Sequence, residues 1–230
     1  MKIGVLLPTF RRGAGDALEC AERAARARLD GVFAYDHLWP MGTPTRPSLA
    51  PFGLLAVAAK RHEELCVGPL VARVGMVGTE HLVREFFTLE SLAPGRVIAA
   101  LGTGDKLSAQ ENAAYGLEER SPNERRAMLR ATHEQLASTM PVWFGAGASA
   151  TNELARSLGA PLNLWDAPIE RVQSECLIGP TTWAGPAPDD VAGHLDALAY
   201  AGVTWAVFSP DTALGPLENW QSTNEVSRFS

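Results

Sequence analysis

Cysteine is scarce in this chain, and long apolar runs are missing. Cys20, Cys66 and Cys176 lie far apart and are odd in number, which fits neither a metal site nor a disulfide framework. No apolar stretch approaches the roughly 20 residues that cross a bilayer. The segment from Met1 to Pro8 leads straight into an expected strand and carries no cleavage signal. We therefore expect reduced thiols, no metal, no membrane contact and a cytoplasmic protein.

An excess of positive charge is missing as well. Lys and Arg number 20 against 26 Asp and Glu, the formal net charge is −6, and basic residues alternate with acidic ones. Because nucleic acids are bound by clustered Lys and Arg, this balance argues against a nucleic-acid partner and favours a small-molecule substrate. With 46% hydrophobic and 20% charged residues, the 230 residues are typical of a globular protein. We expect a single domain over residues 1–230.

What the sequence does contain is a regular alternation of short apolar runs and amphipathic stretches. The apolar runs predict strands at 2–7, 31–35, 66–73, 96–101, 141–145, 161–165, 175–179 and 203–208. The amphipathic stretches predict helices at 14–28, 50–62, 79–92, 122–138, 150–158, 168–173 and 187–201. Such alternation indicates a parallel sheet with helices outside, and eight strands are the count of a (β/α)8 barrel. We therefore expect an α/β fold of the (β/α)8 TIM-barrel type, in preference to an open doubly wound sheet.

Polar side chains follow the second expected strand abruptly. Asp36, His37 and Trp39 come directly after the apolar run 31–35. The working face of a (β/α)8 barrel is built from the loops that follow its strands, so these residues are candidates for the site. Histidine titrates near neutral pH, a neighbouring carboxylate tunes it, and an indole offers a flat wall for a planar ring. A loop histidine with ordinary hydrogen bonds is the alternative.

Two glycine-rich segments follow the fourth and fifth expected strands. From Gly145 to Thr151, small residues precede an expected helix, so that backbone N–H groups and the positive helix end suit a phosphate. A tight connection is an equal alternative, because the order of elements is wrong for a Rossmann unit. The segment from Gly102 to Asp105 also lets a ligand approach the backbone and adds one carboxylate. Its alternative is a turn with a solvated acid.

Taken together, these segments resemble the bacterial-luciferase-like family of flavin and deazaflavin oxidoreductases, which are (β/α)8 barrels. The resemblance begins at Met1 and continues through residues 36–40 (DHLWP) and 67–72 (VGPLVA). It is densest over residues 87–105, and it resumes at 141–145 (PVWFG) and 188–192 (PDDVA). It covers nearly the whole chain. No single motif is diagnostic, but the order and spacing of the motifs are fairly specific.

The resemblance implies catalytic roles for three residues. Asp36 and His37 match a pair that sits over the reactive ring in the deazaflavin-dependent branch, where the histidine moves a proton as hydride passes between substrate and ring. His37 is thus expected to be the general acid or base, and Asp36 the group that orients it. Asp105 matches a glutamate that acts as an acid, although its side chain is shorter. Trp39 lies near a tryptophan of some sugar-phosphate dehydrogenases of that branch, at a different offset from the histidine.

The resemblance also implies three cofactor-binding segments besides Trp39. They are Leu70, Val71 and Ala72; Gly102, Thr103 and Gly104; and Gly145, Ala146, Gly147, Ala148 and Ser149. The first matches a strand bulge whose non-proline cis peptide backs the ring, and the last matches the loop and helix start that hold the cofactor phosphate. Arg73 follows the bulge and is expected either to meet a phosphate or the substrate or to be an exposed structural arginine.

The chain departs from the family pattern after Gly104. Only residues 105–140 lie between that glycine and the fifth expected strand, so the usual excursion that covers the active site is missing, and another contraction follows Trp165. Because lids exclude water, the loss indicates a more open site or one completed by a second subunit. We expect a homodimer through the helices at 50–62 and 79–92. Their apolar residues are Leu54, Leu55, Val57, Leu82, Phe86 and Phe87.

These observations predict an oxidoreductase that transfers hydride between the deazaflavin coenzyme F420 and a small organic substrate. An FMN-dependent monooxygenase of the luciferase-like type is the close alternative, because the same pocket would support oxygen activation by reduced flavin. A non-catalytic flavin-binding barrel is a second alternative, which the shortened lid allows. An unrelated phosphate-handling barrel enzyme is a third. An exposed ring favours the deazaflavin, which reacts slowly with oxygen in the chemistry of this family.

The remaining aromatic and basic residues are expected to be mainly structural. Trp143 and Trp205 lie within expected strands and should be core. Trp165 and Trp183 lie at expected strand ends and either line the pocket or close the barrel top. Arg125, in an expected helix, is interpreted as a solvated helix charge.

Overall fold

The computed structural model of the protein describes residues 1–40, 43–44, 46–104 and 108–226. Within these ranges the strands are β1 (Lys2–Leu6), β2 (Gly31–Ala34), β3 (Cys66–Pro69), β4 (Ala72–Arg73), β5 (Ala99–Gly102), β6 (Val142–Gly145), β7 (Leu162–Trp165), β8 (Thr181–Gly185) and β9 (Trp205–Phe208). The helices of the same ranges are α1 (Gly15–Arg26), α2 (Pro51–Arg61), α3 (Thr79–Leu92), α4 (Ala109–Ala114), α5 (Pro122–Leu136), α6 (Ser149–Ser157), α7 (Ile169–Ile178), α8 (Val191–Ala201) and α9 (Leu214–Val226).

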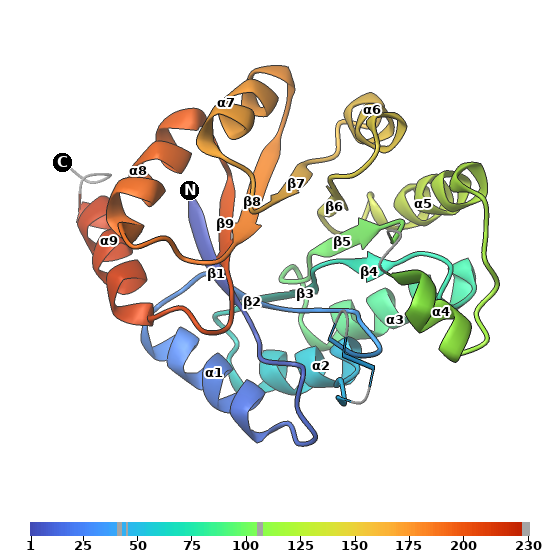
Figure 1. Ribbon diagram of the computed structural model, residues 1–230. Helices are drawn as coiled ribbons and strands as arrows, with labels where there is room; N and C mark the ends of the chain where they lie inside the picture. Colours follow the sequence, from blue (N-terminus) through green and yellow to red (C-terminus); the bar gives the residue numbers. More distant parts are fainter. Residues whose placement is uncertain (41–42, 45, 105–107, 227–230) are drawn as a thin grey trace.

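The strands are parallel and form a barrel with the helices on its outside (Figure 1). Consecutive strands from β1 to β3 and from β4 to β9 pair with one another, and β1 also pairs with β9. β3 and β4 act as one strand interrupted at Leu70–Val71, because β3 pairs with β2 and β4 with β5. Val67 in β3 also pairs with Val97, just ahead of β5, which closes the ring. The (β/α)8 barrel expected from the sequence is thereby confirmed, and the open doubly wound sheet is wrong.

Apolar side chains fill two concentric layers. Inside the barrel, Phe33 stacks on Trp143 with 5.6 Å between the ring centroids, and it meets the ring of Trp205 edge-on at 5.6 Å. Outside, the strands and the inner faces of the helices share a larger apolar core. Trp143 and Trp205 are buried, as the sequence predicts. Trp183 is also buried, and its Nε1 donates to the carbonyl of Ala167 at 3.2 Å, so it packs in the barrel wall.

The strand expected at 175–179 is wrong, because α7 continues to Ile178 and the strand β8 comes only after it. Leu177 and Ile178 make this segment strand-like in sequence, yet they are 90% and 67% exposed at the end of the helix. β8 is rich in hydroxyl groups instead. Buried Thr182 accepts a hydrogen bond from Nδ2 of Asn163 at 2.9 Å, which offsets the cost of burying both polar groups.

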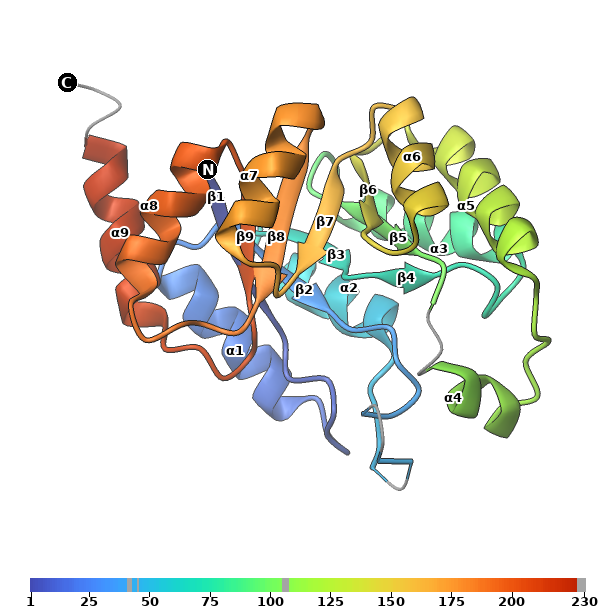
Figure 2. The same ribbon diagram turned by 45° about the horizontal axis from the view of Figure 1, so that its top comes forward.

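Two further helices, α4 and α9, carry no clear apolar pattern and were not expected from the sequence. Figure 2 shows α4 projecting beyond the ring of helices. The start of α5 is set by a capping box, in which Ser121 Oγ accepts from the N–H of Glu124 and the Glu124 carboxylate accepts from the N–H of Ser121. None of the described helices is long and apolar enough to span a membrane.

Candidate active site

A cavity of about 420 Å³ opens at the carboxyl ends of the strands. Its lining comes from the ends of the strands β1 to β7 or from the segments that follow them. This is the face on which (β/α)8 barrels carry their sites, and the volume falls within the range of small-molecule sites. The cavity is therefore the candidate active site.

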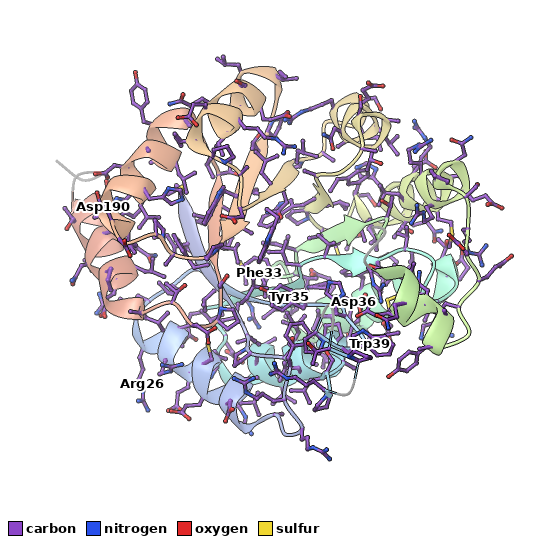
Figure 3. The ribbon with its side chains drawn as sticks, in the orientation of Figure 1. Arg26, Phe33, Tyr35, Asp36, Trp39 and Asp190 are labelled. Carbon is purple, nitrogen blue, oxygen red and sulfur yellow. The ribbon has the colours of Figure 1, made fainter. Side chains whose placement is uncertain are left out.

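Three aromatic rings form one part of the cavity wall. Phe10 stacks on Tyr35 with centroids 5.3 Å apart, and the half-exposed Trp165 meets Tyr35 edge-on at 5.9 Å. Figure 3 shows Tyr35 between Phe33 at the barrel centre and Asp36 toward α4. Burial raises the pKa of Tyr35 to about 12, although a hydrogen bond with Ser209 opposes this rise. The phenol of Tyr35 therefore stays neutral near pH 7. Trp165, the third ring, also lines the cavity.

His37 lines the cavity from the segment after β2, and its partner is a carboxylate on α4. The Nδ1 atom of His37 lies 3.3 Å from each oxygen of Glu111. The Glu111 side chain is 1% exposed, and it also accepts from the backbone N–H of Trp39 at 3.3 Å. Because an ionised carboxylate only accepts, it favours a proton on Nδ1. The Nε2 atom, for which the described residues offer no partner, is left to exchange protons with a ligand.

Arg73 holds the other side of Glu111. Its Nη2 lies 3.0 Å from Oε2 of Glu111, and both side chains are almost fully buried. Its Nε donates to the carbonyl of Asp36 at 3.1 Å, and its Nη1 donates to Oδ1 of Asn112 at 3.3 Å. One guanidinium thus joins the ends of β2 and β4 to α4. Its burial excludes the alternative of an exposed structural arginine.

Asp36 makes its hydrogen bond to the backbone of β4. Its Oδ2 accepts from the N–H of Arg73 at 2.9 Å. Burial raises the pKa of Asp36, while the hydrogen bond from Arg73 and the charges of Arg73 and His37 lower it. The group that is hydrogen-bonded to the ring of His37 is Glu111, so the orienting contact expected from Asp36 comes from α4 instead.

The bulge between β3 and β4 forms the apolar part of the wall. The Leu70–Val71 peptide is cis, as the family resemblance implies. A Cβ at Gly102 would lie 2.4 Å from Cγ2 of Val71, and a Cβ at Gly145 would lie 3.3 Å from its Cγ1. The absence of side chains at these two glycines is what admits Val71 to the cavity wall.

The loop after β6 reaches the cavity with residues 145–147. The N–H of Gly147 already donates to Oδ1 of Asn152, at 2.9 Å. α6 begins at Ser149 without a side-chain cap, and the backbone N–H groups of residues 148–150 find no partner in the described part of the chain. These exposed donors at the positive end of a helix suit an anion.

Most of the residues expected to bind the cofactor surround the cavity. Those that line it, together with His37, are Leu70, Val71, Gly102, Thr103, Gly104, Gly145, Ala146 and Gly147. The expected residues that do not line it are Asp36, Trp39, Ala72, Ala148 and Ser149. Trp39 is buried, with its ring 5.7 Å from that of Tyr115 at the end of α4. Asp105, the third expected catalytic residue, lies outside the described residues.

Glu111 is the site residue that sequence reasoning missed. It lies 74 positions from His37 along the chain, in a short helix that no apolar periodicity marks. Its buried carboxylate becomes a candidate only through its contacts with His37 and Arg73.

The protein-family model described as "Luciferase-like monooxygenase" matches residues 1–134, which is more than half of the chain. The chain belongs to the luciferase-like monooxygenase family. The matched part of this luciferase-like protein includes His37, Arg73 and Glu111, so the network around the candidate site falls within it.

Curated relatives of this luciferase-like protein include F420-dependent glucose-6-phosphate dehydrogenases. The one from Intrasporangium calvum is 28% identical over 175 residues, which are 75% of this chain and 50% of the relative. The one from Beutenbergia cavernae is 31% identical over 131 residues, which are 56% of this chain and 37% of the relative. The chain spans about half the length of the curated relatives it matches.

Solved structures share the luciferase-like barrel at low sequence identity. An F420-dependent secondary alcohol dehydrogenase in complex with an F420–acetone adduct superposes with a TM-score of 0.78 at 14% identity, over 96% of this chain and 97% of the other. A monooxygenase from Streptomyces bottropensis gives 0.73 at 13% identity, over 100% of both chains. The coenzyme F420-dependent tetrahydromethanopterin reductase from Methanopyrus kandleri gives 0.72 at 12% identity, over 94% and 96%. These matches establish the fold.

Proposed function

We propose that this protein transfers hydride between coenzyme F420 and a small organic substrate. Its curated relatives are F420-dependent dehydrogenases, and an F420-dependent alcohol dehydrogenase shares its fold. The observation that carries the proposal is the contact between His37 and Glu111 at the edge of the cavity. It provides a proton-transfer group whose ring is held in one orientation, and such a group is what oxidation of an alcohol or reduction of a carbonyl requires.

The residues of the network have separate tasks in this reaction. When bound, the deazaflavin ring supplies or accepts the hydride. Nε2 of His37 takes the proton of a substrate hydroxyl, or gives a proton to a substrate carbonyl oxygen in the reverse direction. Glu111 against Nδ1 stabilises the imidazolium that carries this proton. Arg73, whose Nη2 lies 3.0 Å from Oε2 of Glu111, supplies the counter-charge to this buried carboxylate.

The cavity fits a tricyclic ring with a phosphate. Val71, Tyr35 and Trp165 offer apolar and aromatic surface for the ring, and the glycines beside Val71 leave the backbone open to close approach. The unpaired N–H groups of residues 148–150 would hold the cofactor phosphate. Ala148 and Ser149 would thus contribute through the backbone and not through their side chains.

An FMN-dependent monooxygenase is the second candidate, and the match to the monooxygenase from Streptomyces bottropensis favours it. Such an enzyme has to shield the reduced flavin and its oxygen adduct from water. Between Gly104 and β6, the described part of this chain has only α4 and α5 for that purpose. A barrel that merely stores flavin is a weaker candidate, because storage needs no oriented histidine and no buried ion pair.

The deciding experiment compares the two cofactors by fluorescence titration of the purified protein. We expect F420 to bind more tightly than FMN. If FMN binds at least about tenfold more tightly, about 1.4 kcal/mol in its favour, the monooxygenase becomes the better proposal. Reduction of bound F420 by a panel of small alcohols then tests turnover. Tight F420 binding without turnover on any of them would support the storage barrel.

A homodimer through α2 and α3 is a further part of the proposal. Four of the six apolar residues taken from the sequence lie in the protein's own core and offer no surface to a partner, namely Leu54, Leu55, Leu82 and Phe86. Val57 and Phe87 remain 41% and 40% exposed, and a groove of about 340 Å³ that includes Phe52 and Leu92 lies between the two helices. We expect light scattering to report twice the 24.6 kDa of one chain, and a single-chain mass contradicts the dimer.

A further inference from the structure

A second cavity, of about 380 Å³, lies beside the candidate active site between the loop after β4, α4 and the start of α5. Arg73, Thr103 and Gly104 line both cavities. The second cavity, called the chamber below, is therefore adjacent to the first. Three arginines from separate segments contribute to its lining, namely Arg73, Arg120 and Arg125.

Two of these arginines have hydrogen-bonding capacity that the described residues do not use. The buried nitrogens without an acceptor are Nε of Arg120 and Nε of Arg125, whereas Nη2 of Arg73 is already paired with Glu111 at 3.0 Å. Arg125 donates through Nη1 to the carbonyl of Thr103 at 3.2 Å, and Arg120 contacts Glu118 at 3.1 Å. A buried donor without an acceptor costs about 1–3 kcal/mol, and more when it is charged.

The described acidic residues that line the chamber are both exposed. They are Glu118 and Glu119, and the side chain of Glu118 is 74% accessible to solvent. Solvent and salt screen such exposed charges strongly. Glu111 contacts Arg73, and its oxygens are shared with His37. Among the described residues that line the chamber, three are cationic and two are acidic.

We propose that this arginine chamber binds a phosphate or carboxylate group of the substrate, so that the protein acts on a small anionic molecule. A guanidinium group can donate two parallel N–H···O bonds to a phosphate or carboxylate group. It therefore recognises the geometry of the oxyanion as well as its charge. A molecule anchored there extends past Thr103 and Gly104, which line both cavities, toward His37. The anion site stands on its own, whereas its assignment to the substrate rests on the proposed function.

The binding test is calorimetric titration of the protein alone with inorganic phosphate and, separately, with acetate, in low-salt buffer. We expect at least one of the two anions to bind. Arg120→Gln and Arg125→Gln should each weaken that binding at least about tenfold, because each removes a charge-assisted hydrogen-bond donor. Arg130→Gln is the matched control, because Arg130 lies on α5 and is exposed but does not line the chamber. Thermal unfolding of each variant verifies that it is folded.

A second titration separates the substrate from the coenzyme, whose own phosphate is the other source of an oxyanion. F420 is titrated into the parent protein with and without saturating phosphate. Unchanged F420 affinity supports the assignment to the substrate. Competition between the two overturns that assignment, because the chamber then takes the coenzyme's phosphate. Absence of binding up to about 10 mM of either anion, or binding that both arginine variants retain, overturns the anion site itself, while the F420 titration still tests the proposed function.

Discussion

The two sides of the candidate active site are built on different principles. On the side of α4, polar side chains from separate elements meet: the partly buried His37 after β2, and the buried Arg73 in β4 and Glu111 in α4. On the side of α6, the groups that face a ligand are the backbone N–H donors of the exposed residues 148–150, at the start of the helix. The first side depends on the identity of each residue. The second depends on the conformation of the loop, so the two sides should respond differently to substitution.

The largest effect should come from removing the carboxylate at the centre of the α4 side. Glu111→Ala leaves the buried guanidinium of Arg73 without its counter-charge, and such a loss costs about 3 kcal/mol or more of the free energy of unfolding. Urea unfolding followed by circular dichroism measures it. Glu134→Ala is the control, because Glu134 is exposed and only loosely paired with Arg130, and it should change the free energy by less than about 0.5 kcal/mol. If Glu111→Ala and Glu134→Ala have the same free energy of unfolding, the contact between Glu111 and Arg73 does not stabilise the fold.

The next largest effect should be on turnover, from a substitution of His37 that leaves the protein folded. His37→Ala should lower turnover about 100-fold or more, since a general acid–base group is lost. Steady-state rates with bound F420 and a reactive substrate measure it, and His81→Ala, on the exposed surface of α3, should keep the parent rate. If the His37 variant turns over like the parent, the histidine has no part in proton transfer.

On the α6 side, substitutions should weaken cofactor binding and leave stability nearly unchanged. Asn152→Ala removes the acceptor that holds the N–H of Gly147, and Gly147→Val restricts the loop backbone, so each should weaken binding about tenfold. Fluorescence titration measures both, with Glu153→Ala on the exposed face of α6 as the control. Parent-like affinity in both loop variants would place the cofactor phosphate elsewhere.

The smallest effect belongs to Tyr35, which lies in the cavity wall. Its pKa of about 12 favours the neutral phenol in the folded state, so the stabilisation is present below pH 10 and is lost as the pH rises toward 12. An ultraviolet absorbance titration should show a late ionisation step near pH 12 that belongs to Tyr35. Tyr35→Phe should remove the late step and flatten the fall in unfolding free energy over this range. A late step that persists in the variant would assign it to another tyrosine.

The sequence predicted the α6 side of the site better than the α4 side. The reason is the distance along the chain between the residues that make each contact. The glycines of the α6 side and the Leu70–Val71 bulge belong to contiguous motifs, so sequence reasoning found them. Glu111 acts through contacts with residues far away along the chain, on a helix without an apolar pattern, and no local signal marks it. Arg125 was expected to be a solvated charge, yet it donates to the carbonyl of Thr103, again across the fold.

The misplaced strand has a different cause. An apolar run usually marks burial, but Leu177 and Ile178 are exposed at the end of α7. The true strand buries Thr181 and Thr182, whose hydroxyl groups are satisfied by hydrogen bonds. Hydropathy patterns cannot reveal such pairing, because it depends on which polar groups the fold brings together.

The pairing of β1 with β9 sets the order in which a newly made chain can complete its barrel. Strands from β4 to β8 find their sheet neighbours as they leave the ribosome, whereas one edge of β1 stays open until β9 has been synthesised. Oδ2 of Asp30 then accepts from the N–H of Ile3 at 2.7 Å and from Nε2 of Gln221 at 3.2 Å. A single carboxylate thus ties β1 to α9. Until β9 has been made, the nascent barrel exposes an unpaired parallel edge on β1, which other chains could extend.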